Sequence, residues 1–433
     1  MKESCDHSGI PESARGAEAG PVRTFLLGSG ISLAGTLLLG LVNLLIRRTL
    51  SLGLSPGDYG MFYSCIALLS MIFAWSNLGI AQSGTALIAE YADRPERSDC
   101  FLVVFTLKMG LAILFFAGIA LFAGAISRRY WGGDHAWLLW IMGAYYVSEA
   151  CFAAFRALWE GLKRFATLRI FQMLTTVAVF SMLVLIRSLT LRGATVTFVC
   201  GSLLTSAVLL IYVSCTRVIR WKLPNSRAIW RRMLRMTTWL AVSTMLLATL
   251  SQMDTVMLTA LKGTRSAAAY NIGLPIMQIV QSCLIFPAVF LPIAVQLCRA
   301  GEQRQLLGFV RWGAVATILA GSAAFFFFRF TGAFWIRLIF DARYTEAAQL
   351  LPWLCSGIVF FSAGNFFTQL LIGLGELKSI AAIAVAVCGL NVLLNYILIR
   401  KFDYLGAGGA TFGSYFVFFA AALLVTRFSI RRV

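Results

Sequence analysis

The feature that most constrains this chain is a series of apolar stretches, each long enough to cross a lipid bilayer. The hydrocarbon core of a bilayer is about 30 Å thick, so a helix needs about 20 apolar residues to span it. The sequence therefore predicts an all-α polytopic membrane protein with about 12 transmembrane helices. The predicted spans are Thr24–Ile46, Tyr59–Ile80, Phe101–Ile126, Ala136–Leu158, Ile170–Ile186, Val196–Cys215, Trp239–Leu261, Ala269–Val295, Phe309–Phe328, Leu350–Leu371, Ser379–Ile399 and Ala407–Val425. The eighth span contains Pro275, Pro287 and Pro292, which predict a kink or an irregular segment.

The composition agrees with a location in lipid. Apolar residues make up 59% of the chain, charged residues 13%, and the mean hydropathy is +0.82. Soluble domains carry about 25% charged residues, so an ordinary globular enzyme, a disordered protein and a secreted disulfide scaffold are excluded. The formal net charge of +19 then belongs to short loops, where membrane topology and anionic lipid account for it. We expect no nucleic-acid partner.

The distribution of basic residues predicts the orientation of the chain. With the N-terminus in the cytoplasm, 23 Lys and Arg fall inside and 13 outside, when residues at span ends are counted with the adjoining loop. Lys108, within the third span, belongs to neither side. Because cytoplasmic loops are enriched in Lys and Arg, both termini are predicted to be cytoplasmic.

The domain organisation is predicted from a basic segment and an internal repeat. Residues 216–238 hold seven Lys and Arg and divide the predicted spans into six and six. Phe155–Leu162 aligns with Phe367–Leu374 at an offset of 212 residues. Halves with an even number of spans enter the membrane from the same side, which predicts two six-helix bundles related by a pseudo-two-fold axis along the membrane normal. The predicted parts are a cytoplasmic tail (1–23), an N-terminal bundle (24–215), a basic cytoplasmic connector (216–238), a C-terminal bundle (239–425) and a cytoplasmic C-terminal tail (426–433).

Residue types that support catalysis or metal binding are scarce. The ten cysteines form no Cys-x-x-Cys pair, and the only histidines are His7 and His135. The sequence has no Gly-x-x-x-x-Gly-Lys-[Ser/Thr] motif, which excludes a P-loop for ATP hydrolysis. We therefore expect no catalytic residue, no metal site and no cofactor.

Short motifs occur along most of the chain in an informative order. The first are Leu54-Ser-Pro-Gly-Asp-Tyr-Gly-Met-Phe62 and Asn77-Leu-Gly-Ile80. The others are Met253-Asp-Thr-Val-Met257 with Lys262-Gly263 and Ala269-Tyr-Asn271, Phe340-Asp-Ala-Arg-Tyr344 with Ala347 and Leu351-Pro352, and Leu390-Asn-Val-Leu-Leu-Asn395 with Gly406-Ala-Gly-Gly-Ala-Thr411. In these segments the chain resembles polysaccharide and oligosaccharide flippases of the multidrug/oligosaccharidyl-lipid/polysaccharide (MOP) exporter superfamily. Members of that family often have glycine where this chain has Asp341 and Ala342, so this turn is expected to differ.

The resemblance implies a flippase of the cell (inner, cytoplasmic) membrane that works by alternating access. Its substrate would be a polyprenyl-(pyro)phosphate-linked glycan, moved from the inner to the outer leaflet. An ATP-free chain would be driven by a coupling cation, a proton or sodium, and would work beside glycan assembly enzymes. Sugars and phosphates cannot cross hydrocarbon unaided, so a polar, cation-bearing cavity is required.

Three other functions stay open. An ion-coupled multidrug antiporter of the same superfamily would need an acid-dominated cavity for drug cations. Lipid II flippases usually carry two more spans than are predicted here. A membrane-bound polysaccharide polymerase or ligase would need an outer loop with catalytic residues, whereas the longest outer loop, Arg329–Gln349, lacks histidine.

Candidate substrate-binding residues are ionisable groups in or beside the N-terminal spans, since charges are costly in lipid. Arg47 and Arg48 follow the first span and suit forked contacts with phosphate; the alternative is an interfacial anchor. Lys108 either faces the cavity or extends its ammonium group to the inner interface. Glu149 and Arg156 share a helical face with Glu160; the alternative is a structural ion pair, such as Glu149 with Lys108.

Asp254, in the seventh span, is the candidate for ion coupling. A carboxylate that changes protonation or binds a cation as its surroundings change would link an ion gradient to conformation. The alternative is a fixed ion pair between Asp254 and Lys262. Asn391 and Asn395 are spaced i, i+4 and are expected to form interhelical hydrogen bonds. The basic connector is expected to lie on anionic lipid, and Phe325–Phe328 to face lipid.

Overall fold

The computed structural model describes residues 21–186, 188–221, 227–284, 303–374 and 376–432. In this part of the chain the secondary structure is helical, without strands. The elements are α1 (Pro21–Gly53), α2 (Pro56–Asn77), α3 (Ile80–Glu90), α4 (Arg97–Trp131), α5 (Ala136–Gly161), α6 (Phe165–Leu185), α7 (Leu191–Cys215), α8 (Arg227–Lys262), α9 (Thr264–Cys283), α11 (Gln303–Ile339), the 3-10 helix η2 (Ala342–Leu350), α12 (Leu351–Gly373) and α13 (Leu377–Arg432).

The predicted spans correspond to these helices. Each lies at least partly on a helix, and α13 carries the last two, with a break at Asp403, where φ is 54° and ψ is −134°. Among the described residues, eight helical segments are long and apolar enough to cross a membrane: α2, α4, α5, α6, α7, α11, η2 with α12, and α13. Pro275 lies inside α9, while Pro287 and Pro292 fall outside the described residues. The all-α polytopic fold is confirmed.

Local sequence sets the helix boundaries. The Ser55 hydroxyl accepts a hydrogen bond from the backbone N–H of Asp58 (3.1 Å), with Pro56 at the first helical position of α2. At the other end of α2, Leu78 and Gly79 have φ values of 44° and 71°, which end the helix. A separate helix, α3, begins at Ile80, the last residue of the second predicted span. α8 already begins at Arg227, so the predicted connector 216–238 is helical in its second half.

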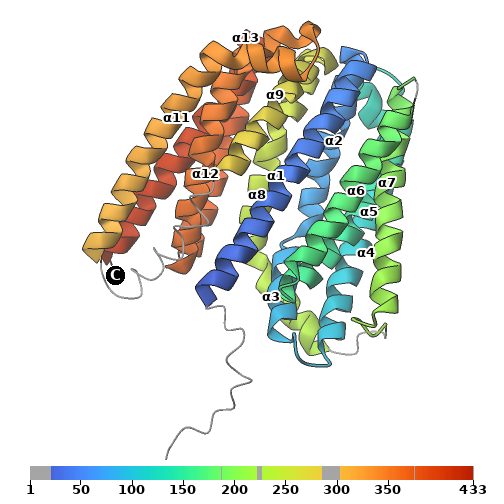
Figure 1. Ribbon diagram of the computed structural model, residues 1–433, viewed down its shortest axis with the longest axis vertical. Helices are drawn as coiled ribbons and strands as arrows, with labels where there is room; N and C mark the ends of the chain where they lie inside the picture. The colour runs from blue at the N-terminus through green and yellow to red at the C-terminus, as the bar shows by residue number, and fades with distance from the viewer. Residues whose placement is uncertain (1–20, 187, 222–226, 285–302, 375, 433) are drawn as a thin grey trace, which may run out of the picture.

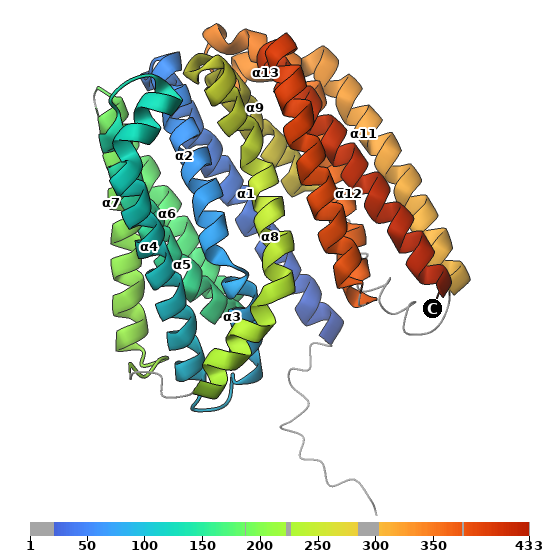
Figure 2. The ribbon, with the colours of Figure 1, turned by 180° about the vertical axis from the view of Figure 1, so that it is seen from behind.

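The helices form two lobes, shown from opposite sides in Figures 1 and 2. The N-lobe contains α2 to α7, and the C-lobe contains α9, α11, η2, α12 and α13. α1 and α8 lie along the boundary, where α1 contacts α6 and α9, and α8 contacts α13 and α2. The lobes are close together where α1 ends and α9 begins, and their helices diverge toward the end where α1 begins and α13 ends (Figure 1). We call the first of these the closed end and the second the terminal end.

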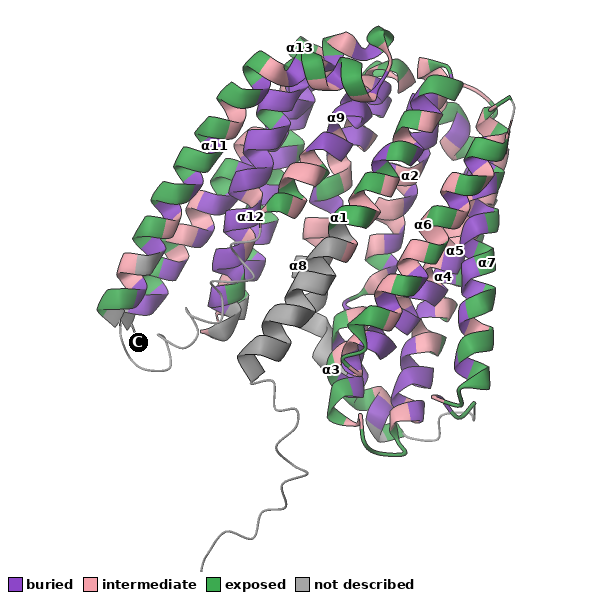
Figure 3. Ribbon diagram, viewed as in Figure 1, coloured by how far each residue is buried: buried purple, intermediate pink, exposed green. Residues whose placement is uncertain are grey.

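Apolar side chains are distributed as expected for a protein surrounded by lipid. Exposed residues follow the outer edges of the lobes in Figure 3, and they include large apolar side chains such as Leu121, Trp312 and Phe330, with exposed fractions of 79%, 74% and 81%. A buried cluster joins the lobes at the closed end, where Tyr59 of α2 packs with Ile272 of α9. Burial therefore serves helix packing, while the exposed apolar surface suits hydrocarbon.

Gly60 allows the closest approach between the lobes. A Cβ at this position of α2 would lie 1.7 Å from the backbone carbonyl oxygen of Thr264, at the start of α9. Only glycine lets the two backbones meet at this distance. The packing of α2 on α9 therefore depends on this residue.

We expect Gly60→Ala to lower the free energy of unfolding by about 1–3 kcal/mol, because the added methyl group overpacks the contact with α9. The measurement is the melting temperature of the purified protein in detergent. Gly110→Ala on α4 is the matched control, since a Cβ there would meet nothing within 4 Å, and its melting temperature should not fall. A Gly60→Ala protein as stable as the parent would contradict the close packing.

Candidate functional site

At the closed end, two arginines of α1 contact the C-lobe. Arg47 Nη1 donates to the backbone carbonyl of Asn271 on α9 (3.0 Å), and its guanidinium lies 4.4 Å from the ring centroid of Tyr63. Arg48 Nη1 donates to the carbonyl of Leu338 on α11 (3.3 Å). Both residues were predicted to bind substrate, and the structure places them in contacts between the lobes.

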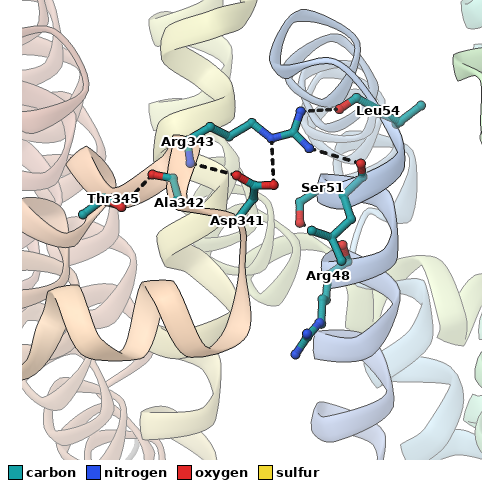
Figure 4. Close-up of polar contacts among 8 residues, drawn as sticks. Arg48, Ser51, Leu54, Asp341, Ala342, Arg343 and Thr345 are labelled. Carbon is teal, nitrogen blue, oxygen red and sulfur yellow. Dashed lines mark hydrogen bonds and ion pairs between the residues drawn. The ribbon is translucent and has the colours of Figure 1, made fainter.

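A third arginine joins the lobes from the opposite direction (Figure 4). Arg343 of η2 donates to the carbonyls of Leu52 (3.1 Å) and Leu54 (3.5 Å), at the C-terminal end of α1. The Asp341 carboxylate lies 3.5 Å from Arg343 Nε and accepts from its backbone N–H at 2.9 Å. The last carbonyls of a helix have no partner within it, so Arg343 satisfies groups that would otherwise need water. Arg343 belongs to one of the sequence motifs, but no contact was predicted for it.

In the N-lobe, Lys108 and Glu149, both predicted to bind substrate, do not form the ion pair that was the alternative. Glu149 Oε1 instead accepts a hydrogen bond from Ser202 of α7 (3.1 Å), whose hydroxyl also contacts Ser148 (2.9 Å). The carboxylate is therefore turned toward α7, away from α4. Lys108 is 7% exposed and has no hydrogen bond or ion pair to any residue that the structure describes.

The other two residues of the polar face of α5, Arg156 and Glu160, contact different neighbours. Arg156 is exposed, and its guanidinium lies 5.8 Å from the ring centroid of Phe152. Glu160 is half-buried and accepts a long hydrogen bond from Thr85 of α3 (3.5 Å). Arg156 is close enough to interact electrostatically with both Lys108 and Glu149. Lys108 nevertheless has no carboxylate partner among the described residues.

Asp254 lies at the centre of a buried polar cluster in the C-lobe. It is 3% exposed, and the hydroxyls of Tyr270 and Thr411 lie 2.8 and 2.7 Å from its Oδ2. Asn395 Nδ2 and Asn391 Nδ2 donate to Oδ1 at 2.6 and 3.3 Å. The cluster joins α8, α9 and both halves of α13. We refer to these five residues as the Asp254 cluster.

The fixed ion pair between Asp254 and Lys262, the alternative to ion coupling, is not formed. Lys262 is exposed and donates to the backbone carbonyl of Arg400 (3.1 Å). Eight positions separate the two residues on α8, or roughly 12 Å along the axis at 1.5 Å per residue. Lys262 is therefore not a partner of the carboxylate, which is held by neutral donors among the described residues.

The predicted hydrogen bonding of the α13 asparagines is confirmed. Asn391 also donates to Ser414 (3.2 Å), and Asn395 Nδ2 lies 3.0 Å from Asn391 Oδ1. Sequence analysis missed Tyr270 and Thr411 as members of the cluster. Their signal was present, since Tyr270 and Thr411 belong to two of the motifs that carry the family resemblance.

The described residues include no group of three or more His, Cys, Asp or Glu that could hold a metal ion. Within the Asp254 cluster, however, Asn395 Oδ1 is buried without a hydrogen-bond partner in the structure. This oxygen and the carboxylate provide the hard oxygen atoms that alkali cations and protons require.

Comparison with known proteins agrees with the fold. Residues 25–298 match the family described as "Polysaccharide biosynthesis protein". An uncharacterised membrane protein of Methanocaldococcus jannaschii is 23% identical over 388 residues, covering 83% of this chain and 75% of that protein.

Solved structures show the same arrangement of helices. An inward-facing multidrug resistance MATE family transporter of the MOP superfamily has a TM-score of 0.72 at 14% identity, covering 92% of this chain and 95% of that one. The outward-facing form has a TM-score of 0.64 at 14% identity, covering 96% and 97%. The lipid II flippase MurJ in an inward closed conformation has a TM-score of 0.70 at 14% identity, covering 93% and 87%. These likenesses show the two-lobed helical fold. The family match spans well over half of the sequence and shows that the chain belongs to the family described as "Polysaccharide biosynthesis protein".

Proposed function

We propose that this protein is a flippase that moves a lipid-linked oligosaccharide or polysaccharide unit from the inner to the outer leaflet. The observation that carries the proposal is Lys108, a buried cation in a membrane-spanning helix that has no carboxylate partner among the described residues. A cation within a membrane-spanning helix is costly unless an anion or water reaches it. An anionic substrate group, such as a phosphate or pyrophosphate, would remove that cost when it binds.

The arrangement of the lobes supports alternating access. Contacts from Arg47, Arg48 and Arg343 hold the closed end together, while the helices diverge toward the terminal end. If both termini are cytoplasmic, as the charge distribution predicts, this is an inward-facing state. The higher TM-score to the inward-facing MATE transporter than to its outward-facing form, 0.72 against 0.64, supports the same assignment.

In this proposal, the coupling cation binds at the Asp254 cluster. Its carboxylate is surrounded by hydroxyl and amide groups rather than by a fixed cation. A proton or a sodium ion would neutralise it there, and Asn395 Oδ1 would provide a further oxygen ligand. Because the cluster joins α8, α9 and α13, its occupancy would change how tightly the C-lobe helices hold together.

An ion-coupled multidrug antiporter is the second candidate, favoured by the likeness to MATE transporters. Drug cations require an exposed acidic site. In the N-lobe, the Glu149 carboxylate is occupied by a hydrogen bond from Ser202. Lys108 is positively charged and would repel a drug cation. The charge of the site therefore favours an anionic substrate.

We expect Lys108→Gln to weaken binding of polyprenyl pyrophosphate by roughly 10-fold to 150-fold, which corresponds to the loss of one charged hydrogen bond of about 1.5–3 kcal/mol. Binding of the pyrophosphate lipid to the purified protein is measured by fluorescence quenching. Lys378→Gln, which changes an exposed lysine at the start of α13, is the control and should bind as the parent does. Equal affinity in Lys108→Gln, or preferential binding of tetraphenylphosphonium by the parent, would count against an anionic substrate.

Asp254→Asn should fold and bind substrate but transport it without dependence on a proton or sodium gradient. The change removes the charge while keeping the shape of the side chain. Transport into proteoliposomes is measured with each gradient imposed separately. Lys262→Gln is the control and should stay gradient-dependent, because Lys262 contacts only a backbone carbonyl among the described residues. Parental gradient dependence in Asp254→Asn would remove the cluster from the coupling mechanism.

A further inference from the structure

A pocket lies within the C-lobe, apart from the closed-end arginines, Lys108 and the Asp254 cluster. It has a volume of about 560 Å³ and lies between α11, η2, the start of α12 and the turn of α13. Phe325, Phe330 and Trp353 form apolar parts of its wall, and Arg329, Thr345 and Gln349 form polar parts. One side of the pocket thus suits hydrocarbon, while the other suits a polar group.

Arg329 is the unusual member of this wall. It lies on α11 roughly 15 Å before the end of the helix, at 1.5 Å per residue. Its neighbours on that helix are strongly exposed phenylalanines, Phe326 at 59%, Phe330 at 81% and Phe334 at 61%. The guanidinium is itself exposed and has no hydrogen bond or ion pair within the described chain. An arginine among lipid-facing aromatic rings requires an anionic partner or water.

The polar groups beside Arg329 can complete such a site. Thr345 donates its hydroxyl proton to the carbonyl of Ala342 (2.6 Å), which leaves its oxygen able to accept. Gln349 is exposed, and its amide has no hydrogen bond within the described chain. A headgroup that offers both a charged phosphate and hydroxyl donors would satisfy all three side chains.

We propose that this pocket binds one anionic phospholipid, with its phosphate on Arg329, its headgroup hydroxyls on Thr345 and Gln349, and an acyl chain along Phe330. The aromatic walls select a lipid over a free anion, because inorganic phosphate would leave the apolar surface exposed to water. The lipid belongs to the leaflet on the side of η2, which is the outer leaflet in the predicted orientation. The site does not depend on the transported substrate.

The test uses the full-length protein in detergent and counts bound dioleoyl phosphatidylglycerol by native mass spectrometry. The parent should retain one lipid that Arg329→Gln binds at least tenfold more weakly. Arg337→Gln is the matched control, because Arg337 is exposed on the same helix but does not line the pocket, and it should bind as the parent does. Ala333→Trp, which leaves Arg329 intact but fills the pocket, should also lose the lipid. A melting temperature close to that of the parent would establish that each variant is folded.

Three results would overturn the proposal. The first is parental retention of phosphatidylglycerol by Arg329→Gln or by folded Ala333→Trp. The second is equal retention of dioleoyl phosphatidylcholine by the parent, since the positive charge would then select no anionic lipid. The third is displacement of the lipid by inorganic phosphate, which would show a site for the free anion.

Discussion

The contact between the end of α1 and the C-lobe is the interaction on which the rest of the structure depends. Arg47, Arg48 and Arg343 all donate to backbone carbonyls across the boundary, and Gly60 brings two backbones together beside them. Carbonyl acceptors carry no full charge, so these bonds are weaker than buried ion pairs and can be exchanged for water. These hydrogen bonds can therefore stabilise the state with a closed end and still be broken when that end opens.

The helices of the C-lobe are held to one another by a buried polar cluster. Asp254 accepts hydrogen bonds from residues on α9 and α13. In addition, Ser266 near the start of α9 donates to Asp403 at the break in α13 (2.9 Å). Lys262 adds a bond from the end of α8 to the carbonyl of Arg400. These contacts join the boundary helix α8 to α9 and α13, so the three helices are expected to move together when the closed end separates. A cation at Asp254 would then affect the whole lobe rather than one side chain.

The bilayer explains why so much of the fold was predictable and so little of the site. A membrane helix must satisfy its own backbone over about 30 Å, so apolar length alone located the helices. The break at Leu78 and Gly79 falls just before the predicted end of the second span at Ile80. The helix α3 that follows was not predicted, because it is too short to span a bilayer. Side-chain partners depend on which helices meet. Lys262 is near Asp254 in sequence but lies too far along α8, whereas Asn395 and Thr411, more than a hundred residues away, reach the carboxylate. Glu149 likewise accepts a hydrogen bond from Ser202 of α7, so the alternative ion pair with Lys108 is not formed.

The central claim is that the closed end must open during transport, and a reversible cross-link tests it most directly. A Cβ at Gly57 of α2 would lie 4.0 Å from Thr264 Oγ1 on α9, which suits a disulfide between Gly57→Cys and Thr264→Cys. With the single variants as controls for the native cysteines, the oxidised double variant should form the cross-link and stop flipping lipid-linked glycan, and reduction should restore the activity. Transport at the parental rate by the fully cross-linked protein would contradict the account.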